Sequence, residues 1–310
     1  MKKIEVKKVA QLTGHKGGIF TLTPSDEQYL FLSGAGDGWI VEWDLRHPKD
    51  GRLLARAEDT QINGKASIFA LLKHNDLILA GNMNGGLHWI FPNDTSKNKN
   101  SLPHKKGVFD AQVIDNQLFT LGGQGVLTKW SLTNQLPTES IQLSGKSLRA
   151  IDFFPKRNEL AIGASDGNIY ILNATELSIK YTLQNAHDNS VFTLKYAPDG
   201  SQLWSGGRDA HLKVWDVENI FENIFSVPAH WYTVNSLVFS PDGKMVATGS
   251  RDKTIKIWDT KNFQLLKVLD TIKNGCHVNS VNTLLWSEYN HWLVSGSDDR
   301  SIIVWEILVN

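Results

Sequence analysis

The stretch of sequence that decides the fold is SGGRDAHLKVWD, residues 205–216. Nearly the same pattern returns as TGSRDKTIKIWD at 248–259, SGSDDRSIIVWE at 295–306 and SGAGDGWIVEWD at 33–44. Each copy joins a small-residue turn, an aspartate, an alternating apolar run and a tryptophan followed by an acid. Self-similarity at a fixed spacing is the signature of a repeat architecture. These copies therefore predict a chain built from repeated units.

Three weaker copies fill the interval between these four: AGNMNGGLHWIF at 80–91, TLGGQGVLTKWS at 120–131 and IGASDGNIYILN at 162–173. Aligning all seven places one residue of each in a single apolar column: Trp43, Ile90, Trp130, Leu172, Trp215, Trp258 and Trp305. Successive members of this column are separated by 47, 40, 42, 43, 43 and 47 residues. Chance apolar runs do not produce so regular a period, so the sequence predicts seven units.

Each unit has the pattern of short strands joined by turns. In the sixth unit VNSLVFS (234–240) alternates as a strand, PDGK forms a tight turn, and MVATGS leads to a second strand. RDKT then turns the chain, IKIWD is a third strand, and FQLLKVLD (263–270) supplies a fourth. No stretch of ten or more residues has a helical period. The chain is therefore predicted to be all-β.

The composition is that of an ordinary globular protein, with 41% hydrophobic and 21% charged residues. The 32 basic residues balance the 32 acidic ones, which gives no broad attraction for nucleic acid or anionic lipid, although a local patch is compatible with this balance. The single cysteine, Cys276, has no partner for an internal disulfide, which fits a reducing compartment. The opening MKKIEVKKVAQLTGH has no apolar run of signal-peptide length, and nowhere do 18 apolar residues follow one another. We therefore expect a cytoplasmic protein without a membrane span.

The repeat resembles the Trp-Asp (WD) repeat, and the resemblance covers essentially the whole chain. It implies one domain over residues 1–310, a seven-bladed β-propeller of four-stranded antiparallel blades around a central channel. It also implies a buried hydrogen-bonded set of His, Ser or Thr, Asp and Trp within a blade. Four blades have the complete set: His15, Ser33, Asp37, Trp43; His187, Ser205, Asp209, Trp215; His230, Thr248, Asp252, Trp258; and His277, Ser295, Asp299, Trp305.

Blades 2 to 4 depart from this pattern. Gly64 and Ser144 stand where His is expected, and Ile90 and Leu172 replace Trp. The third blade keeps His104 and Trp130 but has Gln124 in place of Asp. We expect these three blades to rely on apolar packing alone.

The two ends of the chain are expected to share the last blade. Five residues follow Trp305, which is too few for a fourth strand, while residues 4–12 precede the first His and have no other place. The N-terminal segment is therefore predicted to be the outer strand of the final blade. This arrangement removes the open edges that a ring would otherwise expose.

The resemblance also indicates a partner-binding face at the narrow end of the channel. The residues five after the His column are Phe20, Phe69, Phe109, Arg149, Phe192, Asn235 and Asn282. Those before the Asp column include Met83, Arg208, Arg251 and Asp298. Aromatic and Arg residues are enriched in binding hot spots, and arginines suit a carboxylate-bearing peptide. The alternative is that the phenylalanines pack between blades and only line the channel.

Other motifs favour structural interpretations. No His-x-x-x-His or Cys-x-x-Cys spacing indicates a metal, and no cofactor is expected. The glycine-rich run at 34–38 precedes a strand, whereas a phosphate-binding loop requires a helix N-terminus. Residues 43–46, Trp-Asp-Leu-Arg, resemble the Trp-Asp-x-Arg of ubiquitin-ligase substrate receptors, although Arg46 is also compatible with a solvated loop. Solvated loops are expected at 93–100 and 271–275.

We therefore predict a monomeric, non-catalytic interaction scaffold that docks peptides or protein domains, of acidic character, on its top face and blade edges. A ubiquitin-ligase substrate receptor is one alternative. A propeller enzyme with its site at the channel mouth is another, and nucleic-acid binding through the rim arginines is a third. No nucleophile motif of the Gly-x-Ser-x-Gly type supports the enzyme.

Overall fold

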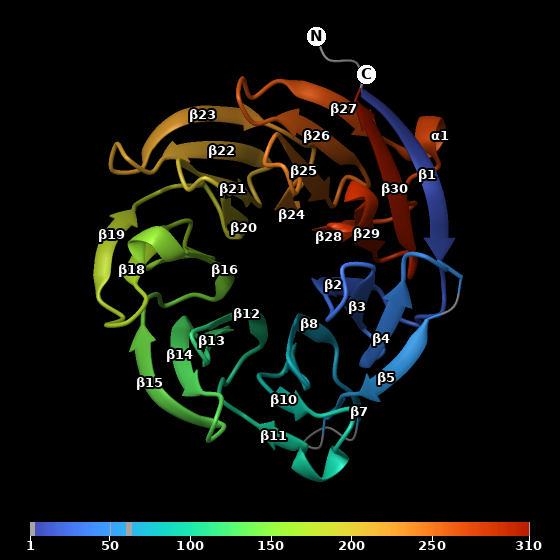
Figure 1. Cartoon of the computed structure of the whole chain (residues 1–310). Helices are drawn as coiled ribbons and strands as arrows, with labels where there is room; N and C mark the ends of the chain where they lie inside the picture. The colour runs from blue at the N-terminus through green and yellow to red at the C-terminus, as the bar shows by residue number, and fades with distance from the viewer. Residues whose placement is uncertain (1–3, 50, 60–63, 310) are drawn as a thin grey trace.

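Seven four-stranded antiparallel sheets are arranged around a central channel in a computed structural model, which describes residues 4–49, 51–59 and 64–309 (Figure 1). In blades 1 to 6 the strand nearest the channel comes first in the chain and the next strands follow outward, whereas in blade 7 the outermost strand, β1, comes from the start of the chain. This is the seven-bladed propeller predicted from the repeats. The predicted segments 245–250 and 255–259 coincide with two strands of the sixth blade, and its fourth strand is shorter than predicted.

The blades follow the order of the chain. Blades 1 to 3 contain β2 (Ile19–Pro24), β3 (Leu30–Ala35), β4 (Trp39–Asp44) and β5 (Arg52–Arg56); β8 (Ile68–His74), β9 (Leu77–Asn82), β10 (Leu87–Ile90) and β11 (Lys99–Ser101); and β12 (Val108–Ile114), β13 (Gln117–Gly122), β14 (Val126–Ser131) and β15 (Leu136–Gln142). Blades 4 and 5 contain β16 (Leu148–Phe154), β17 (Glu159–Ala164), β18 (Ile169–Asn173) and β19 (Ile179–Leu183); and β20 (Val191–Tyr196), β21 (Gln202–Gly207), β22 (His211–Asp216) and β23 (Glu222–Pro228). Blades 6 and 7 contain β24 (Val234–Phe239), β25 (Met245–Ser250), β26 (Ile255–Asp259) and β27 (Leu265–Leu269); and β28 (Val281–Trp286), β29 (Leu293–Ser297), β30 (Ile302–Val309) and β1 (Ile4–Leu12).

The remaining elements are short. A hairpin of β6 (Glu58–Asp59) and β7 (Gly64–Lys65) precedes blade 2, and the 3-10 turns are η1 (Thr95–Lys97), η2 (Pro155–Arg157) and η3 (Tyr289–His291). The loop expected at 93–100 holds η1 and the start of β11, and the one expected at 271–275 holds α1 (Thr271–Asn274). The Asp270 side chain accepts from the Lys273 N–H at the start of α1, and Gly275 ends it with a left-handed φ of 63°. None of the helices in the described residues is long and apolar enough to span a bilayer.

Closure of the ring follows the prediction. β1 covers the predicted residues 4–12 and pairs antiparallel with β30, from Ile4 opposite Val309 to Leu12 opposite Ile302. The last blade therefore contains both the first strand, β1, and the last strand, β30, which lie side by side in Figure 1. Residues 1–3 lie outside the described part of the chain.

The hydrophobic core lies between adjacent blades. Small residues of the second strand let the next blade approach closely, so a Cβ added to Gly249 would stand 2.8 Å from Val281. The same contact closes the ring, where a Cβ on Gly296 would stand 2.7 Å from Ile19. Around that last interface Leu12, Ile19 and Val304 form one buried cluster. The last and first blades are thus packed like blades 6 and 7.

Candidate functional site

Four blades carry the buried hydrogen-bonded set that the resemblance implied. In blade 6 the His230 Nδ1 lies 2.9 Å from Asp252, and its Nε2 lies 2.9 Å from the Thr248 hydroxyl. The Trp258 indole donates to the same hydroxyl at 3.0 Å. Since a carboxylate only accepts, the imidazole proton is on Nδ1 and Nε2 accepts from the hydroxyl. The equivalent bonds occur in the sets of blades 1, 5 and 7: His15, Ser33, Asp37, Trp43; His187, Ser205, Asp209, Trp215; and His277, Ser295, Asp299, Trp305.

The aspartates of these sets also hold two loops together at one end of the channel, which we call the mouth face. Asp252 accepts the backbone N–H of Trp231, before the inner strand, and of Thr254, between the second and third strands. Burial alone raises the pKa of Asp37, but hydrogen bonds from His15 and from backbone N–H groups outweigh it and lower the pKa to about 2. These ionised carboxylates therefore fix the loops from which the mouth face is built.

Blades 2 to 4 do not rely on apolar packing alone, and that expectation was wrong. In blade 3 the His104 Nε2 lies 2.9 Å from the Thr120 hydroxyl, which also accepts from the Trp130 indole. Gln124 donates to the His104 Nδ1 at 3.0 Å, so the imidazole proton is on Nε2, the reverse of the other blades. Without a carboxylate beside it, burial lowers the pKa of His104 to about 4.

The polar sets of blades 2 and 4 use other residue types at other positions. In blade 2 the Asn82 amide donates to His88, whose second ring nitrogen lies 2.8 Å from the Asn100 amide oxygen. In blade 4 the Ser144 and Tyr170 hydroxyls both donate to Asp166, at 2.6 and 2.7 Å. The hydroxyl groups of Ser144 and Tyr170 thus supply hydrogen bonds to the aspartate of a blade that lacks the His and the Trp.

The seven blades are equivalent at the mouth face. In each, the residue before the Asp column donates its backbone N–H to the carbonyl of the residue three after the His column. The pairs are Gly36 to Gly18, Met83 to Ser67, Gly123 to Gly107, Ser165 to Ser147, Arg208 to Ser190, Arg251 to Thr233 and Asp298 to Ser280, at 2.7 to 3.1 Å. Residues aligned between the weak and the strong repeats therefore occupy equivalent backbone positions in the structure.

A β-bulge begins the inner strand of every blade. The register skips one residue there, for example between Ile19 and Thr21 in blade 1. The skipped residues are the predicted column five after the His: Phe20, Phe69, Phe109, Arg149, Phe192, Asn235 and Asn282. A bulge re-aims a side chain, and these seven side chains alone line one cavity of about 230 Å³. We call them the mouth ring.

The aromatic members of the mouth ring are half-buried and pack against each other around the cavity. Phe20 and Phe69 stack with centroids 4.6 Å apart, and Phe69 meets Phe109 edge to face at 6.0 Å. The Arg149 guanidinium lies 4.0 Å from the Phe109 centroid and 5.3 Å from that of Phe192. The phenylalanines thus pack against each other and line a cavity, while their role in binding a partner stays a prediction.

The two asparagines of the mouth ring donate hydrogen bonds to the next blade. The Asn282 amide donates to the Ile19 carbonyl and to Asp298, at 3.1 and 2.7 Å. The Asn235 amide donates to Ser280 and to the Val281 carbonyl. Two of the predicted residues are therefore committed to neighbouring blades, and Asp298 is held by Asn282 rather than facing solvent freely.

Outside the mouth ring, three predicted residues are exposed: Met83, Arg208 and Arg251. Among the described residues, no carboxylate forms an ion pair with Arg208 or Arg251. Arg208 is close enough to Arg149 to lower the pKa of that buried guanidinium further, after the larger effect of burial. We call Arg208 and Arg251 the outer arginines.

Sequence reasoning missed the exposed apolar residues of this face. Trp231 and Tyr232, which follow the blade 6 His, are 86% and 60% exposed, and Val278, which follows the blade 7 His, is 63% exposed. Ile272 of α1 is 96% exposed, and the neighbouring Thr271 hydroxyl donates to the His277 carbonyl. The sequence offered one signal for the exposure of Trp231 and Val278, which is their position directly after the His column. The backbone N–H at this position bonds the aspartate of the polar set, while the side chain points outward.

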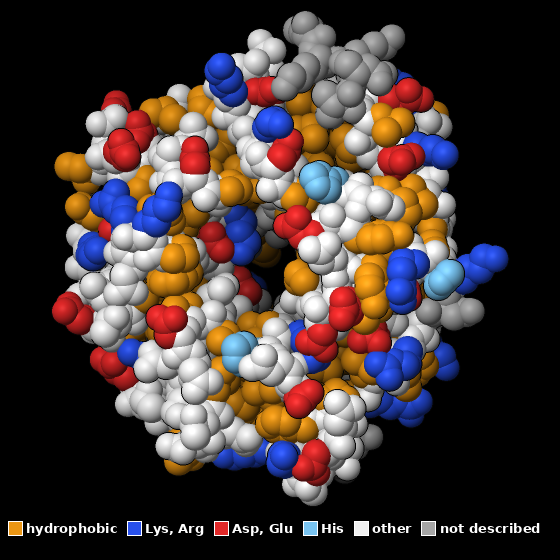
Figure 2. All heavy atoms as spheres, in the orientation of Figure 1, with side chains coloured by type: hydrophobic (Ala, Val, Ile, Leu, Met, Phe, Trp, Pro, Cys, Tyr) orange, Lys and Arg blue, Asp and Glu red, His pale blue; other side chains and the backbone are white. Residues whose placement is uncertain are grey.

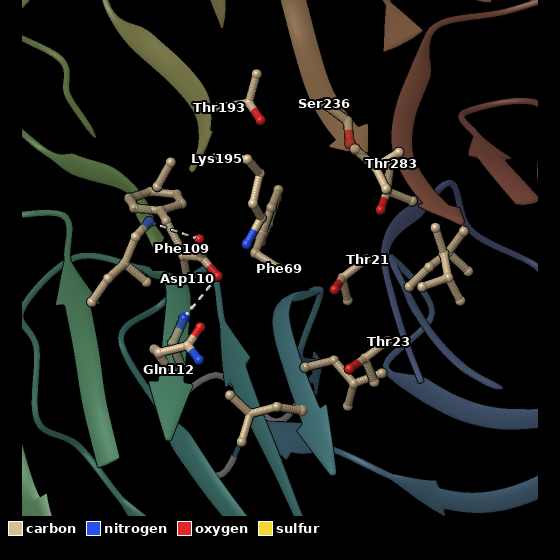
Figure 3. A pocket seen from close by; sticks show the side chains of 18 of the residues that line it. Thr21, Thr23, Phe69, Phe109, Asp110, Gln112, Thr193, Lys195, Ser236 and Thr283 are labelled. Atoms are coloured by element: carbon tan, nitrogen blue, oxygen red, sulfur yellow. Dashed lines mark hydrogen bonds between the residues drawn. The ribbon is translucent and has the colours of Figure 1, made fainter. Parts of the chain in front are cut away.

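Below the mouth ring, the channel widens into a cavity of about 740 Å³ lined by the inner strands of all seven blades. Lys195 and Asp110 lie on its wall from different blades (Figure 3). Asp110 accepts the Ile151 N–H at 3.0 Å, and burial raises its pKa to about 6. Lys195 pairs with Asp152 at 2.7 Å. These bonds link blade 3 to blade 4 and blade 4 to blade 5, which is a structural role.

The remaining candidate residues from the sequence analysis, Arg46 and Cys276, are engaged or buried in the structure. Arg46 donates to its own Asp44 and lies 3.5 Å from the Tyr29 ring centroid, so its guanidinium is already engaged. Within the described residues, no group of three His, Cys, Asp or Glu side chains is placed to hold a metal ion. Cys276 is free and buried, and burial raises its pKa to about 12.

The face seen in Figure 2 carries acidic and basic side chains interspersed around a central hollow. This mixture agrees with the balanced total charge.

Comparison with known proteins gives the family. The model of the family described as "WD domain, G-beta repeat" matches residues 6–44, 178–216, 221–259 and 266–306, about half of the chain. A crystal structure of the WD40 β-propeller domain of Doa1 is similar, with a TM-score of 0.82 over 97% of each chain at 16% identity, and 1856 chains of solved structures match in all. No curated protein matches the sequence. At this identity the structural likeness shows the fold alone, but the four repeat matches settle membership: the chain belongs to the WD40-repeat family.

Proposed function

We propose that this protein is a non-catalytic scaffold that docks an acidic segment of another protein on its mouth face. WD40 propellers generally serve as protein-interaction scaffolds and are typically not enzymes. The fold itself selects no partner, because one architecture hosts many functions. The proposal therefore depends on the residues of the face.

The observation that carries it is the pair of outer arginines beside exposed aromatic side chains. Arg208 and Arg251 are exposed, and no ion pair neutralises them among the described residues. The Arg251 N–H bonds the Thr233 carbonyl, next to Trp231 and Tyr232 in the same loop. Trp, Tyr and Arg are the residues most enriched in interface hot spots, and a carboxylate is the planar partner that guanidinium groups prefer.

The rigidity of the face supports the same proposal. Asp252 and Asp299 hold the loops of blades 6 and 7 by hydrogen bonds to the N–H groups of Trp231 and Val278. A surface fixed in advance loses less conformational entropy when a partner binds. The exposed side chains can therefore act as anchors on a rigid base.

The test is capture of partners from the native cells with the charge-reversed variant Arg208→Glu plus Arg251→Glu. Reversing two charges that face an acidic partner should weaken its binding at least about tenfold at low salt. The matched control is Lys156→Glu plus Lys261→Glu, which makes the same charge change in loops at the opposite end of the blades. Equal recovery of every partner by the two variants would refute the proposal.

No observation favours an enzyme or a ubiquitin-ligase receptor over this function. Arg46, on which the receptor alternative rested, is engaged by Asp44 and Tyr29. The proposal includes a cytoplasmic location and a monomeric state. The lone buried thiol of Cys276 is compatible with a reducing compartment.

A further inference from the structure

The mouth ring contains a cation without a counter-ion. Arg46, Arg52 and Arg157 each lie within ion-pair distance of a carboxylate. Arg149 has no such partner among the described residues, although it is less exposed than Arg46 and Arg52. A partly buried guanidinium that lacks an anion retains a desolvation cost that a bound carboxylate would offset.

The environment of Arg149 leaves its end groups free. Its Nε donates to the Ser165 hydroxyl at 3.0 Å, and the guanidinium lies over Phe109. This contact orients the group, while no described residue accepts from its two terminal nitrogens. Burial, and secondly Arg208, lower the pKa of Arg149, which shows how little negative charge surrounds it.

The other residues of the mouth ring favour a ligand that has an apolar group next to its anion. Four phenylalanines line the same cavity, so a charged group alone would leave most of the wall without contacts. The Asn235 amide oxygen, in contrast to its amide nitrogen, has no donor among the described residues. The cavity thus offers an anion site, an apolar wall and one hydrogen-bond acceptor.

The size of the cavity limits the occupant. Pockets for drug-sized molecules hold about 300–1,000 Å³, whereas this one holds about 230 Å³. Its seven residues also line the larger channel cavity, so the mouth ring is the entrance to that channel. The mouth ring therefore holds a single residue rather than a longer segment, and one chain end supplies such a residue.

We propose that the mouth ring binds the C-terminal residue of a partner protein, with its α-carboxylate on Arg149 and an apolar side chain among the phenylalanines. The proposal rests on the docking function above and names the group recognised at the centre of that face. An Asp or Glu side chain brings a carboxylate with little apolar surface. A C-terminal residue such as leucine brings both, together with an amide N–H for Asn235.

The experiment compares synthetic peptides that differ in one group. The probes are acetyl-Gly-Ser-Gly-Leu with a free C-terminal carboxylate, the same peptide as a C-terminal amide, and acetyl-Gly-Ser-Asp-Gly-amide with only a side-chain carboxylate. Their dissociation constants are measured by calorimetry, and the Arg149 Nε–H resonance is followed by NMR. The free acid should bind at least about tenfold more tightly than either other peptide, and only it should shift that resonance.

Substitutions test the assigned group. Arg149→Gln should reduce binding of the free acid to the level of the amide and leave the amide unaffected. Arg251→Gln is the matched control and should change the affinity for the free acid by less than about threefold, since Arg251 lies outside the cavity. Circular dichroism melts establish that each variant is folded.

Three results would overturn the proposal: equal affinities of acid and amide, a free acid whose binding Arg149→Gln does not alter, or no binding of the acid at millimolar concentration. Tight binding of the side-chain carboxylate peptide would also overturn it in favour of an internal acidic residue. The outer-arginine variant is independent of these outcomes. Loss of partners in that variant, with no preference for the free acid, would retain the docking function and remove the terminal-residue site.

Discussion

Blades 1, 5, 6 and 7 and blades 2, 3 and 4 form the same sheet with different interiors. The first group contains the complete sets of His, Ser or Thr, Asp and Trp and is the part that the family model matches. The second group has a Gln, an Asn–His–Asn chain or a Ser–Asp–Tyr cluster in that place. Yet every blade has four strands, and every inner strand begins with a bulge.

This difference separates two roles within the repeat. The polar set satisfies buried groups and fixes the loops, and several residue combinations achieve that. The bulge places one side chain in the mouth ring, and no blade lacks it. The identity of the polar set therefore affects stability, whereas the bulged residue forms the lining of the mouth cavity.

The largest expected effect comes from removing the outer strand of blade 7. Deleting residues 1–12 leaves the β30 edge unpaired and exposes the cluster around Ile19 and Val304. A complete polar set should not compensate for this loss, because unpaired edges and apolar surface promote association. Light scattering after size exclusion should show aggregates or an unfolded chain.

Rescue provides the complementary measurement. A synthetic peptide of residues 1–12 added during refolding should restore the monomeric propeller by occupying the vacant position. A well-behaved monomer without the peptide would show that ring closure does not need β1.

The next effect distinguishes the two groups of blades directly. Asp252→Ala leaves the His230 imidazole and the N–H groups of Trp231 and Thr254 without their acceptor. Leaving several partly buried donors unpaired should cost roughly 3–5 kcal/mol, against about 1 kcal/mol for Gln124→Ala in blade 3. Thermal melts should show a loss of several degrees for the first variant and a much smaller loss for the second. Equal melting temperatures would mean that the carboxylate is not what distinguishes these blades.

The histidine that lacks a carboxylate should contribute to the pH dependence in the direction opposite to Asp110, whose raised pKa favours the native protein at low pH. Burial lowers the pKa of His104 from 6.5 to about 4, so between these values the unfolded chain binds more protons than the native protein. Stability should therefore fall as the pH decreases from about 6.5 to 4, by roughly 3 kcal/mol from this residue. His187 and His230, whose pKa values burial also lowers, contribute in the same direction. In melts at graded pH, His104→Gln should reduce the slope, and an unchanged slope would exclude His104 as its source.

The smallest effect should come from giving blade 3 the aspartate that blades 1, 5, 6 and 7 have. The Gln124 side-chain oxygen is buried without a donor, and Gln124→Asp supplies the acceptor that the other blades have. The change should raise the free energy of unfolding by about 1 kcal/mol at pH 7 and raise the pKa of His104, because a carboxylate favours the protonated ring. NMR titration of the imidazole measures the second effect. A pKa of His104 that falls in this variant would contradict the role given to the aspartate in the hydrogen-bonded sets.

The repeat spacing predicted the fold down to the closure of the ring, since both depend on periodicity and on counting strands. The seven members of the mouth ring were also predicted, because the bulge occurs at a constant distance from the His column. The polar sets of blades 2 and 4 were not foreseen, because Asn82 and Tyr170 contribute from other positions of the repeat. The exposure of Trp231 was also missed, although its position directly after the His column offered a signal for it.

The central claim is that partners bind the mouth face rather than the opposite end of the blades. Hydrogen exchange of the free protein and of its complex with a captured partner tests this most directly. The account predicts added protection in the loops 208–210, 230–233 and 251–254, with none at 155–158 and 260–263. Protection confined to those last two loops would contradict it.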